Sequence, residues 1–210
     1  MKWLHEQFTK TINNIGFAKL EHPILYNAKF GIRCEIGDPN IKCYIEDEIN
    51  FEYINSAIDR AKTIYQNLPY QPDILCIDIY PDEEISPHNL TLDNVYEIGL
   101  EQPTETCDEN IVEYDFSYTV RHLYWDLTKT EINLGILLKN IILADFGYFN
   151  SLTSNVYFIN VQDDLLFHLY DDRGVDIVSK EKEILRPIYL KYNDLILDYD
   201  RDKIDNVFLK

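Results

Sequence analysis

The chain has 210 residues, of which 46% are hydrophobic and 13% aromatic, and its formal net charge is −18. This length and this hydrophobic content are sufficient for a substantial buried core and exclude an intrinsically disordered chain. Nucleic acids and anionic membrane surfaces repel so acidic a chain, so we expect neither as a direct partner, whereas a basic protein is compatible with the charge.

The first eighty residues alternate between helical and strand patterns. Hydrophobic residues at helical spacing predict an opening amphipathic helix: Leu4, Phe8, Ile12 and Ile15. The stretch "FGIRCEIG" then alternates with a period of two, which predicts a half-buried strand with Arg33 and Glu35 on the polar side. Asn50 is placed to cap the next helix. The nearly continuous hydrophobic run "DILCIDIY" is typical of a central strand that is covered on both faces.

The second half begins with an excursion over residues 81–110, which is rich in proline and predicts loops with at most one short helix. "VEYDFSYTV" alternates cleanly and predicts one strand near a sheet edge. Thr128 and Glu131 form a capping box for a hydrophobic helix. "NVYFINV" and "LLFHLY" predict a hairpin, and Ser179 is the expected N-cap of a last helix.

This order of elements predicts an α+β fold. We expect a single mixed, largely antiparallel sheet with helices mainly on one face, and a ferredoxin-like split βαβ unit is one arrangement that would build it. We treat residues 1–210 as a single domain. Within it, we distinguish an N-terminal βαβ part of about residues 1–80, the acidic excursion over residues 81–110, and a C-terminal part over residues 111–210.

The stretch "HLYDDRGVD" gathers more chemistry-bearing residues than any other. We interpret it as a structural turn formed by Asp171, Asp172, Arg173, Gly174 and Asp176. The arginine fork would pair with the carboxylates, and the glycine would adopt a positive φ. The alternatives are a contact with a ligand, and a reaction in which His168 and the carboxylates converge on a substrate.

Other candidate sites have little support in the sequence. No phosphate-binding loop, GxSxG or HExxH pattern occurs, and we expect no metal and no cofactor. "DYDRDKIDN" begins like a calcium loop but has Lys203 where the bend needs glycine. The four cysteines form no CxxC pair and no hydrophobic run approaches a membrane span of ~18–20 residues. We therefore expect reduced thiols, no membrane partner and a cytoplasmic location.

The interval between Lys62 and Arg121 is the most distinctive electrostatic feature. It contains thirteen Asp or Glu residues and no Lys or Arg. Such a one-signed field attracts a cationic partner, and tyrosines among the acids are useful contact residues. Residues expected to bind a partner are Asp108, Glu109, Glu113, Tyr114, Asp115 and Tyr118. An acidic surface without any partner is the alternative.

The sequence also resembles a known family. "FHLYDDRGVDIV" and "LRPIYLKYNDLILDYDRDKIDNVF" resemble the C-terminal signature of a bacterial family of domains of unknown function that carries an Asp-Arg-Gly motif. "EHPILYNAKFGIRCEIG" is similar to that family's N-terminal region. The family has no assigned activity. Its members are similar to small acidic immunity proteins encoded beside bacterial toxins, and the resemblance therefore implies immunity.

Three functional hypotheses remain open from the sequence. The first is a non-enzymatic, acidic immunity protein that occludes the basic cleft of a cognate toxin domain, such as a nuclease. The second is a hydrolase or metal-dependent enzyme that uses His168 with the carboxylates of Asp171, Asp172 and Asp176. The third is a cytoplasmic adaptor or regulator of unknown function.

Overall fold

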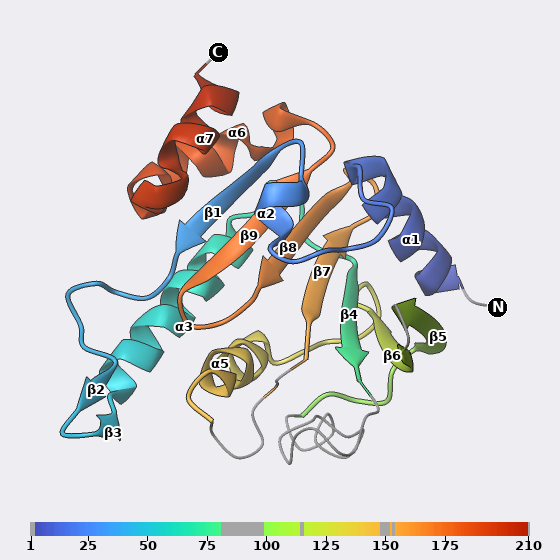
Figure 1. Ribbon diagram of the computed structural model, residues 1–210, viewed down its shortest axis with the longest axis horizontal. Helices are drawn as coiled ribbons and strands as arrows, with labels where there is room; N and C mark the ends of the chain where they lie inside the picture. Colours follow the sequence, from blue (N-terminus) through green and yellow to red (C-terminus); the bar gives the residue numbers. More distant parts are fainter. Residues whose placement is uncertain (1–2, 81–98, 114–115, 148–151, 153, 210) are drawn as a thin grey trace.

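The centre of the molecule is a seven-stranded sheet, seen in a computed structural model that describes residues 3–80, 99–113, 116–147, 152 and 154–209 (Figure 1). In spatial order the strands are β1 (Gly31–Glu35), β9 (Gly174–Ser179), β8 (Leu165–Leu169), β7 (Val156–Asn160), β4 (Ile74–Ile79), β6 (Phe116–Asp126) and β5 (Glu105–Glu113). Each neighbouring pair in this sheet is antiparallel. A separate two-stranded hairpin consists of β2 (Tyr44–Ile45) and β3 (Glu48–Ile49). The predicted α+β class is confirmed.

Helices cover both faces of this sheet, but most of them pack on one face. The described helices are α1 (Trp3–Ile15), α2 (Ile24–Asn27), α3 (Phe51–Gln66), α5 (Leu134–Ala144), α6 (Lys182–Lys191) and α7 (Asp198–Phe208), with a 3-10 turn over Asn193–Leu195. Side chains of α3, α5, α6 and α7 form the larger hydrophobic core against one face. The helix α1 and Ile24 of α2 form a smaller core against the other. None of the described helices combines the length and the hydropathy that crossing a bilayer requires.

The strand β4 shows why the sheet has two cores. Its six residues are all buried, as the run "DILCIDIY" predicts. Leu75 and Ile77 contribute to the larger core, whereas Ile74 and Cys76 contribute to the smaller one. Because successive side chains of a strand point to opposite faces, a strand covered on both sides must be hydrophobic on both.

The chain connections contain two split βαβ units. The helix α5 joins β6 to β7, which run in the same direction with β4 between them, as in a ferredoxin-like unit. The helix α3 joins β1 to β4, which also run in the same direction, but β9, β8 and β7 all lie between them. The unit that contains α5 therefore keeps the spacing of the ferredoxin arrangement, whereas three strands from the C-terminal part separate β1 from β4 in the unit that contains α3.

Several local predictions were wrong. "VEYDFSYTV" is not one strand, because Glu113 pairs with Phe116 and the chain reverses there from β5 into β6. Residues 105–110 form a strand, not a loop, while residues 81–98 lie outside the described part. The N-cap of α5 is Asn133, and the N-cap of α6 is Glu181. Ser179 ends β9, and Thr128 instead donates its hydroxyl hydrogen bond to Asp126 at 2.5 Å.

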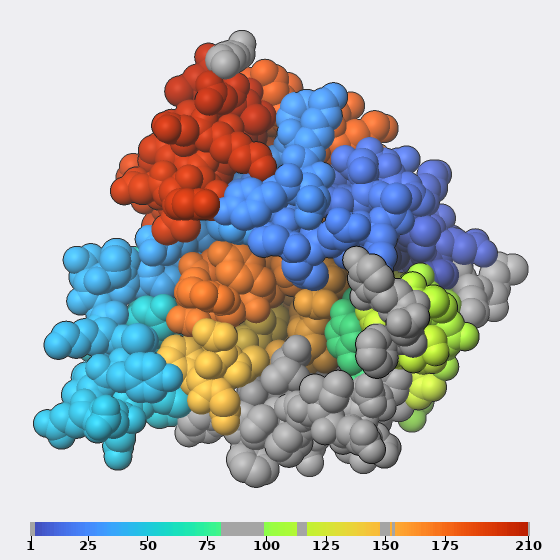
Figure 2. Space-filling model, in the orientation of Figure 1, coloured from blue at the N-terminus to red at the C-terminus, as the bar shows by residue number. Residues whose placement is uncertain are grey.

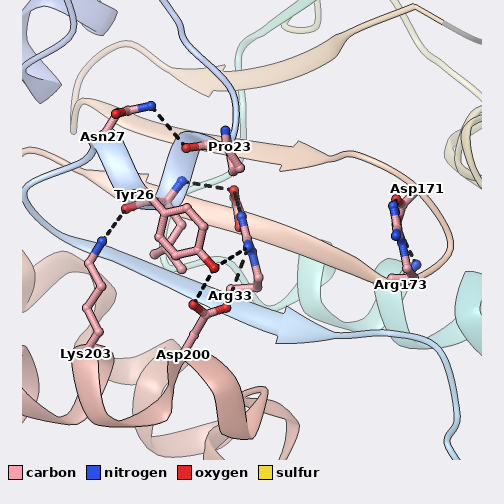
Figure 3. Close-up of polar contacts among 10 residues, drawn as sticks. Pro23, Tyr26, Asn27, Arg33, Asp171, Arg173, Asp200 and Lys203 are labelled. Atoms are coloured by element: carbon pink, nitrogen blue, oxygen red, sulfur yellow. Dashed lines mark hydrogen bonds and ion pairs between the residues drawn. The ribbon is translucent and has the colours of Figure 1, made fainter.

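Arg33 was expected to face solvent, but it is buried in an ion pair that joins the first strand to the last (Figure 3). Its Nε and Nη2 donate to the two carboxylate oxygens of Asp176 at 2.7 and 2.8 Å. The guanidinium also lies 5.0 Å from the ring centroid of Tyr26 and 5.1 Å from that of Tyr170. Asp200 of α7 accepts a hydrogen bond from the Tyr26 hydroxyl at 2.8 Å and lies 3.6 Å from Arg33. Burial is tolerated because each charge faces an opposite charge or an aromatic ring.

We expect Arg33→Met to destabilise the protein by about 3–5 kcal/mol, because it leaves the buried carboxylate of Asp176 without its cation. Urea unfolding followed by circular dichroism measures the loss. Glu183→Ala, which removes one partner of an exposed pair with Arg186, is the control and should cost far less. Equal losses in the two variants would contradict the role assigned to Arg33.

Candidate functional site

A row of polar and aromatic side chains crosses the sheet on the face that α1 covers. Cross-strand register and ring contacts place one residue from each strand in it. From the β5 end to the β1 end the row is Glu105, Tyr124, Cys76, Tyr157, His168, Asp176 and Arg33. The opposite face of the same strands is lined by the larger hydrophobic core. The chemistry-bearing groups of the sheet are therefore concentrated on the α1 side.

The N-terminal segment is fastened to this row through hydrogen bonds. Glu105 accepts hydrogen bonds from the backbone N–H groups of Leu4 and His5 at 2.8 and 3.1 Å, at the positive end of α1. The His5 ring lies 2.9 Å from the Tyr124 hydroxyl, and the His22 ring lies 2.9 Å from the Tyr157 hydroxyl. These hydrogen bonds hold both α1 and the loop after it against the sheet, and they thereby define the space that lies between them and the strands.

That space is a cavity of about 380 Å³ between α1, the loop after it and the strands β4, β5, β6 and β7. Its lining combines aromatic, histidine and carboxylate side chains, as ligand pockets commonly do. Those that carry titratable groups are His5, Lys19, His22, Asp78, Tyr80, Cys107, Asp108, Glu109, His122, Tyr124 and Tyr157. We regard this cavity as the candidate functional site.

His122, in the cavity wall, faces a carboxylate with each of its two ring nitrogens. Its Nδ1 lies 2.7 Å from Asp78 Oδ1, and its Nε2 lies 3.2 Å from Glu109 Oε2. Burial of the ring opposes protonation, but the hydrogen bonds and charges of the two carboxylates outweigh it and raise the pKa of His122. The ring is thus largely buried, with a carboxylate oxygen facing each of its two nitrogens.

Cys76 lies beside Asp78 and His122, but its environment does not favour a nucleophilic thiolate. Its Sγ is 3.6 Å from Asp78 Oδ1, and the residue is fully buried. Burial, followed by the nearby charge of Asp78, raises the pKa of the thiol well above its ordinary value. The thiol is therefore protonated in the metal-free protein and unreactive.

Two groups of described residues have the donors to hold a metal ion. The first is Cys76, Asp78 and His122, and the second is Asp145, Asp171 and Asp172. In the second group Asp171 is engaged by Arg173 and Asp172 accepts a hydrogen bond from Tyr53 at 2.6 Å. The carboxylates of Asp171 and Asp172 are thus already matched by donors from the protein.

The "HLYDDRGVD" motif divides between the two faces of the sheet. Asp171 accepts hydrogen bonds from the backbone N–H and Nε of Arg173 at 2.7 and 2.8 Å, which closes the turn after β8 (Figure 3). Asp176 does not pair with Arg173, since its partner is Arg33.

The prediction of a positive φ for Gly174 was wrong, because the backbone of this glycine does not adopt a positive φ. A Cβ there would overlap the hydroxyl of Tyr170 and lie 3.1 Å from the carbonyl oxygen of Cys34, so glycine is required by close packing.

His168 is buried on the α1 side and is not brought together with Asp171 or Asp172. Its Nδ1 is 2.9 Å from the carbonyl oxygen of Val156, and its Nε2 has no hydrogen-bond partner among the described residues. Burial lowers the pKa of His168 to about 3. The ring stays neutral and packs between His22 and Tyr157, with centroids 4.8 and 5.0 Å away.

The residues predicted to bind a partner lie along the β5–β6 hairpin. Asp108 forms a two-point ion pair with Arg121 at 2.7 and 3.0 Å, and Glu109 contacts His122. Tyr118 is half-buried, with its ring centroid 6.3 Å from that of Tyr80. Glu113 ends β5, and Tyr114 and Asp115 lie outside the described residues. The acidic interval is thus compensated at Asp108 by the arginine that ends it.

The pairing of Asp78 with His122 and of Arg33 with Asp176 was missed from the sequence. A signal was present for Asp78, which is a charged residue inside a run that otherwise reads as a buried strand, whereas Arg33 lies on the polar side of an alternating pattern. A charge in such a position needs a partner, and the partner is the residue that the register places opposite. The register itself was not available from local patterns.

We expect Gly174→Ala to lower the free energy of unfolding by about 1–3 kcal/mol, because the added methyl group overpacks the site and pushes Tyr170 away from Arg33. Gly135→Ala is the matched control. Its Cβ meets nothing closer than 3.6 Å and should be neutral or stabilising by up to ~1 kcal/mol. Thermal and urea unfolding of the two variants measure this difference in stability. Equal stabilities of the two variants would contradict the close packing assigned to Gly174.

His168 should make stability depend on pH. The unfolded chain binds a proton at this residue below a pKa of 6.5, whereas the folded protein does so only near 3. Stability therefore falls as the pH drops through this window, by up to ~1.4 kcal/mol per pH unit from this group. Urea unfolding at several pH values should show a shallower fall for His168→Gln than for the wild type. Since the carboxylates are common to both proteins, parallel curves would contradict the assignment.

Comparison with known proteins gives a family without an assigned activity. A family model described as a domain of unknown function (DUF3885) matches residues 4–200. The uncharacterized protein YnaE of Bacillus subtilis (strain 168) is 22% identical over 197 aligned residues, and the match covers 84% of this chain and 91% of that protein. No solved structure matches the chain. Because the model spans nearly all of the chain, this protein belongs to the DUF3885 family of domains of unknown function.

Proposed function

We propose that this protein is a non-enzymatic binding protein that engages a basic protein partner through the acidic β5–β6 hairpin. The partner that fits best is a toxin domain with a basic catalytic cleft, such as a nuclease, and the protein would act as its immunity protein by covering that cleft. The observation that carries the proposal is that the acidic interval runs through β5, the terminal strand of the sheet.

The position of β5 supports this role. The other terminal strand, β1, is followed outward by the C-terminal segment, which bridges to it at Ile196 and packs α6 and α7 nearby. On β5, the exposed residues Asp108, Glu109 and Asn110 follow one another, and Val112 is 74% exposed. A terminal strand with exposed carboxylates and a hydrophobic side chain suits a partner that brings cations and a complementary surface.

The enzymatic alternative has weaker geometric support. It requires His168 to work with Asp171, Asp172 or Asp176, but those carboxylates are bound to Arg173, Tyr53 and Arg33. The neutral, fully buried ring of His168 is poorly placed to exchange protons with a substrate. The other alternative is an adaptor or regulator that binds a different partner. Identifying the partner distinguishes this function from that of an immunity protein.

The cytoplasm is the proposed location. The four cysteines, all within the described residues, form no disulfide, and Cys34, Cys76 and Cys107 are buried. Free buried thiols are usual in reducing compartments. A toxin that acts on nucleic acid would also have to be met there.

The test is the rate of association with toxin domains encoded beside the gene, measured by stopped flow over a range of salt concentrations. Chelator is present throughout, so that metal ions do not contribute. We expect the rate to fall by at least ~10-fold from low to high salt, because opposite charges accelerate the encounter. We expect Asp108→Asn/Glu109→Gln to lower the low-salt rate.

The matched control is Asp194→Asn/Asp202→Asn, which removes two exposed carboxylates at the opposite end of the sheet. It should leave the rate nearly unchanged although the net charge is altered equally. A rate that is indifferent to salt, or an equal effect of the two double variants, would remove the electrostatic argument. Failure to bind any neighbouring toxin would favour the adaptor alternative.

A further inference from the structure

Three different metal-binding side chains converge at one wall of the cavity. Cys76 and Asp78 are two residues apart on β4 and point to the same face, and His122 lies directly opposite Asp78 on β6. One donor atom from each residue lies within 4.8 Å of the others. Both strands are in the interior of the sheet, so the backbone holds these donors without the freedom of a loop.

Glu109 provides a second observation that points to a metal ligand. It contacts the Nε2 atom of His122, while Nδ1 is the atom that faces Asp78. Histidines that bind a metal through one nitrogen usually donate the other N–H to a carboxylate, which fixes the orientation of the ring. The contact between Glu109 and Nε2 therefore holds the His122 ring in the orientation that points Nδ1 toward Asp78.

The cavity provides access and room for a further ligand. Asp78, His122 and Glu109 all line it, whereas Cys76 closes the group from the sheet side. An ion held by the three residues would have one coordination position on the cavity side. A hydrogen-bonded cluster that serves stability alone is the competing explanation, since Asp78 already accepts from His122 and Cys76.

We propose that Cys76, Asp78 and His122 bind a zinc ion, with a fourth position open to the cavity. A thiolate, a carboxylate and an imidazole suit Zn²⁺, whereas Mg²⁺ and Ca²⁺ prefer oxygen ligands alone. Three protein ligands with one open position are typical of zinc sites that bind water or an anionic ligand. This inference is independent of the proposed partner binding.

Cobalt(II) is the probe, because it replaces zinc and absorbs light when bound to thiolate. The full chain is freed of metal with chelator, and Co²⁺ is added with absorbance recorded. We expect one equivalent to produce thiolate-to-cobalt charge-transfer absorption and the intense visible bands of a four-coordinate ion, both removed by Zn²⁺. Cys76→Ser should abolish the charge-transfer band, and Cys43→Ser, which alters the exposed cysteine, should not.

Glu109→Gln keeps the three ligands and should weaken Co²⁺ binding by about 10–100-fold. This variant changes a partly exposed side chain and guards against misfolding of Cys76→Ser, which circular dichroism would reveal. The proposal is overturned if no cobalt band appears, if the band depends on Cys43 and not on Cys76, or if Glu109→Gln binds as tightly as the wild type. None of these readouts involves a toxin, so they fail or succeed separately from the partner experiment.

Discussion

The buried pair of Arg33 and Asp176 is the constraint on which the arrangement of the chain depends. It joins the first strand of the sheet to the last across 143 positions of sequence. The backbone N–H of Leu25 also donates to Asp176, and Asp200 approaches the same arginine from α7. Figure 2 shows the segment that contains α2 and β1 packed against the C-terminal helices. A buried charge of this kind is stable only when all of its partners are in place, so the two ends of the chain must fold together.

The two faces of the sheet differ in chemistry. One face is a continuous hydrophobic layer under α3, α5, α6 and α7, which supplies most of the apolar burial. The other holds hydrogen-bonded groups in fixed positions under α1, with hydrophobic residues between them. Rigid strands align these groups more accurately than loops would, which is a condition for selective binding of an ion or small ligand.

Sequence patterns predicted what depends on near neighbours. The opening helix, the covered strand β4 and the hairpin of β7 and β8 follow from spacing and composition within about ten residues. The single strand expected over "VEYDFSYTV" failed because a period-two pattern can continue through a tight reversal, and local alternation does not distinguish the two. The helix caps at Asn133 and Glu181 were missed because several nearby residues could serve equally well.

The candidate site could not be predicted from local sequence patterns, because its residues come from distant parts of the chain. His122 and Asp78 are 44 positions apart, and they meet only because β6 lies beside β4 in one register. A shift of one residue would turn His122 to the other face of the sheet. The interpretation of Asp171 and Arg173 as a turn needed no such information, since the two residues are neighbours in the chain.

The acidic terminal strand also bears on how copies of this protein behave toward one another. The free edge of a sheet is a template for a further strand, and proteins that leave one open tend to self-associate through it. Here, two molecules meeting edge to edge would oppose Asp108 and Glu109 of one with the same carboxylates of the other. Mutual repulsion would thus disfavour like-with-like pairing along β5, the terminal strand among the described residues, whereas a chain of opposite charge would not be repelled.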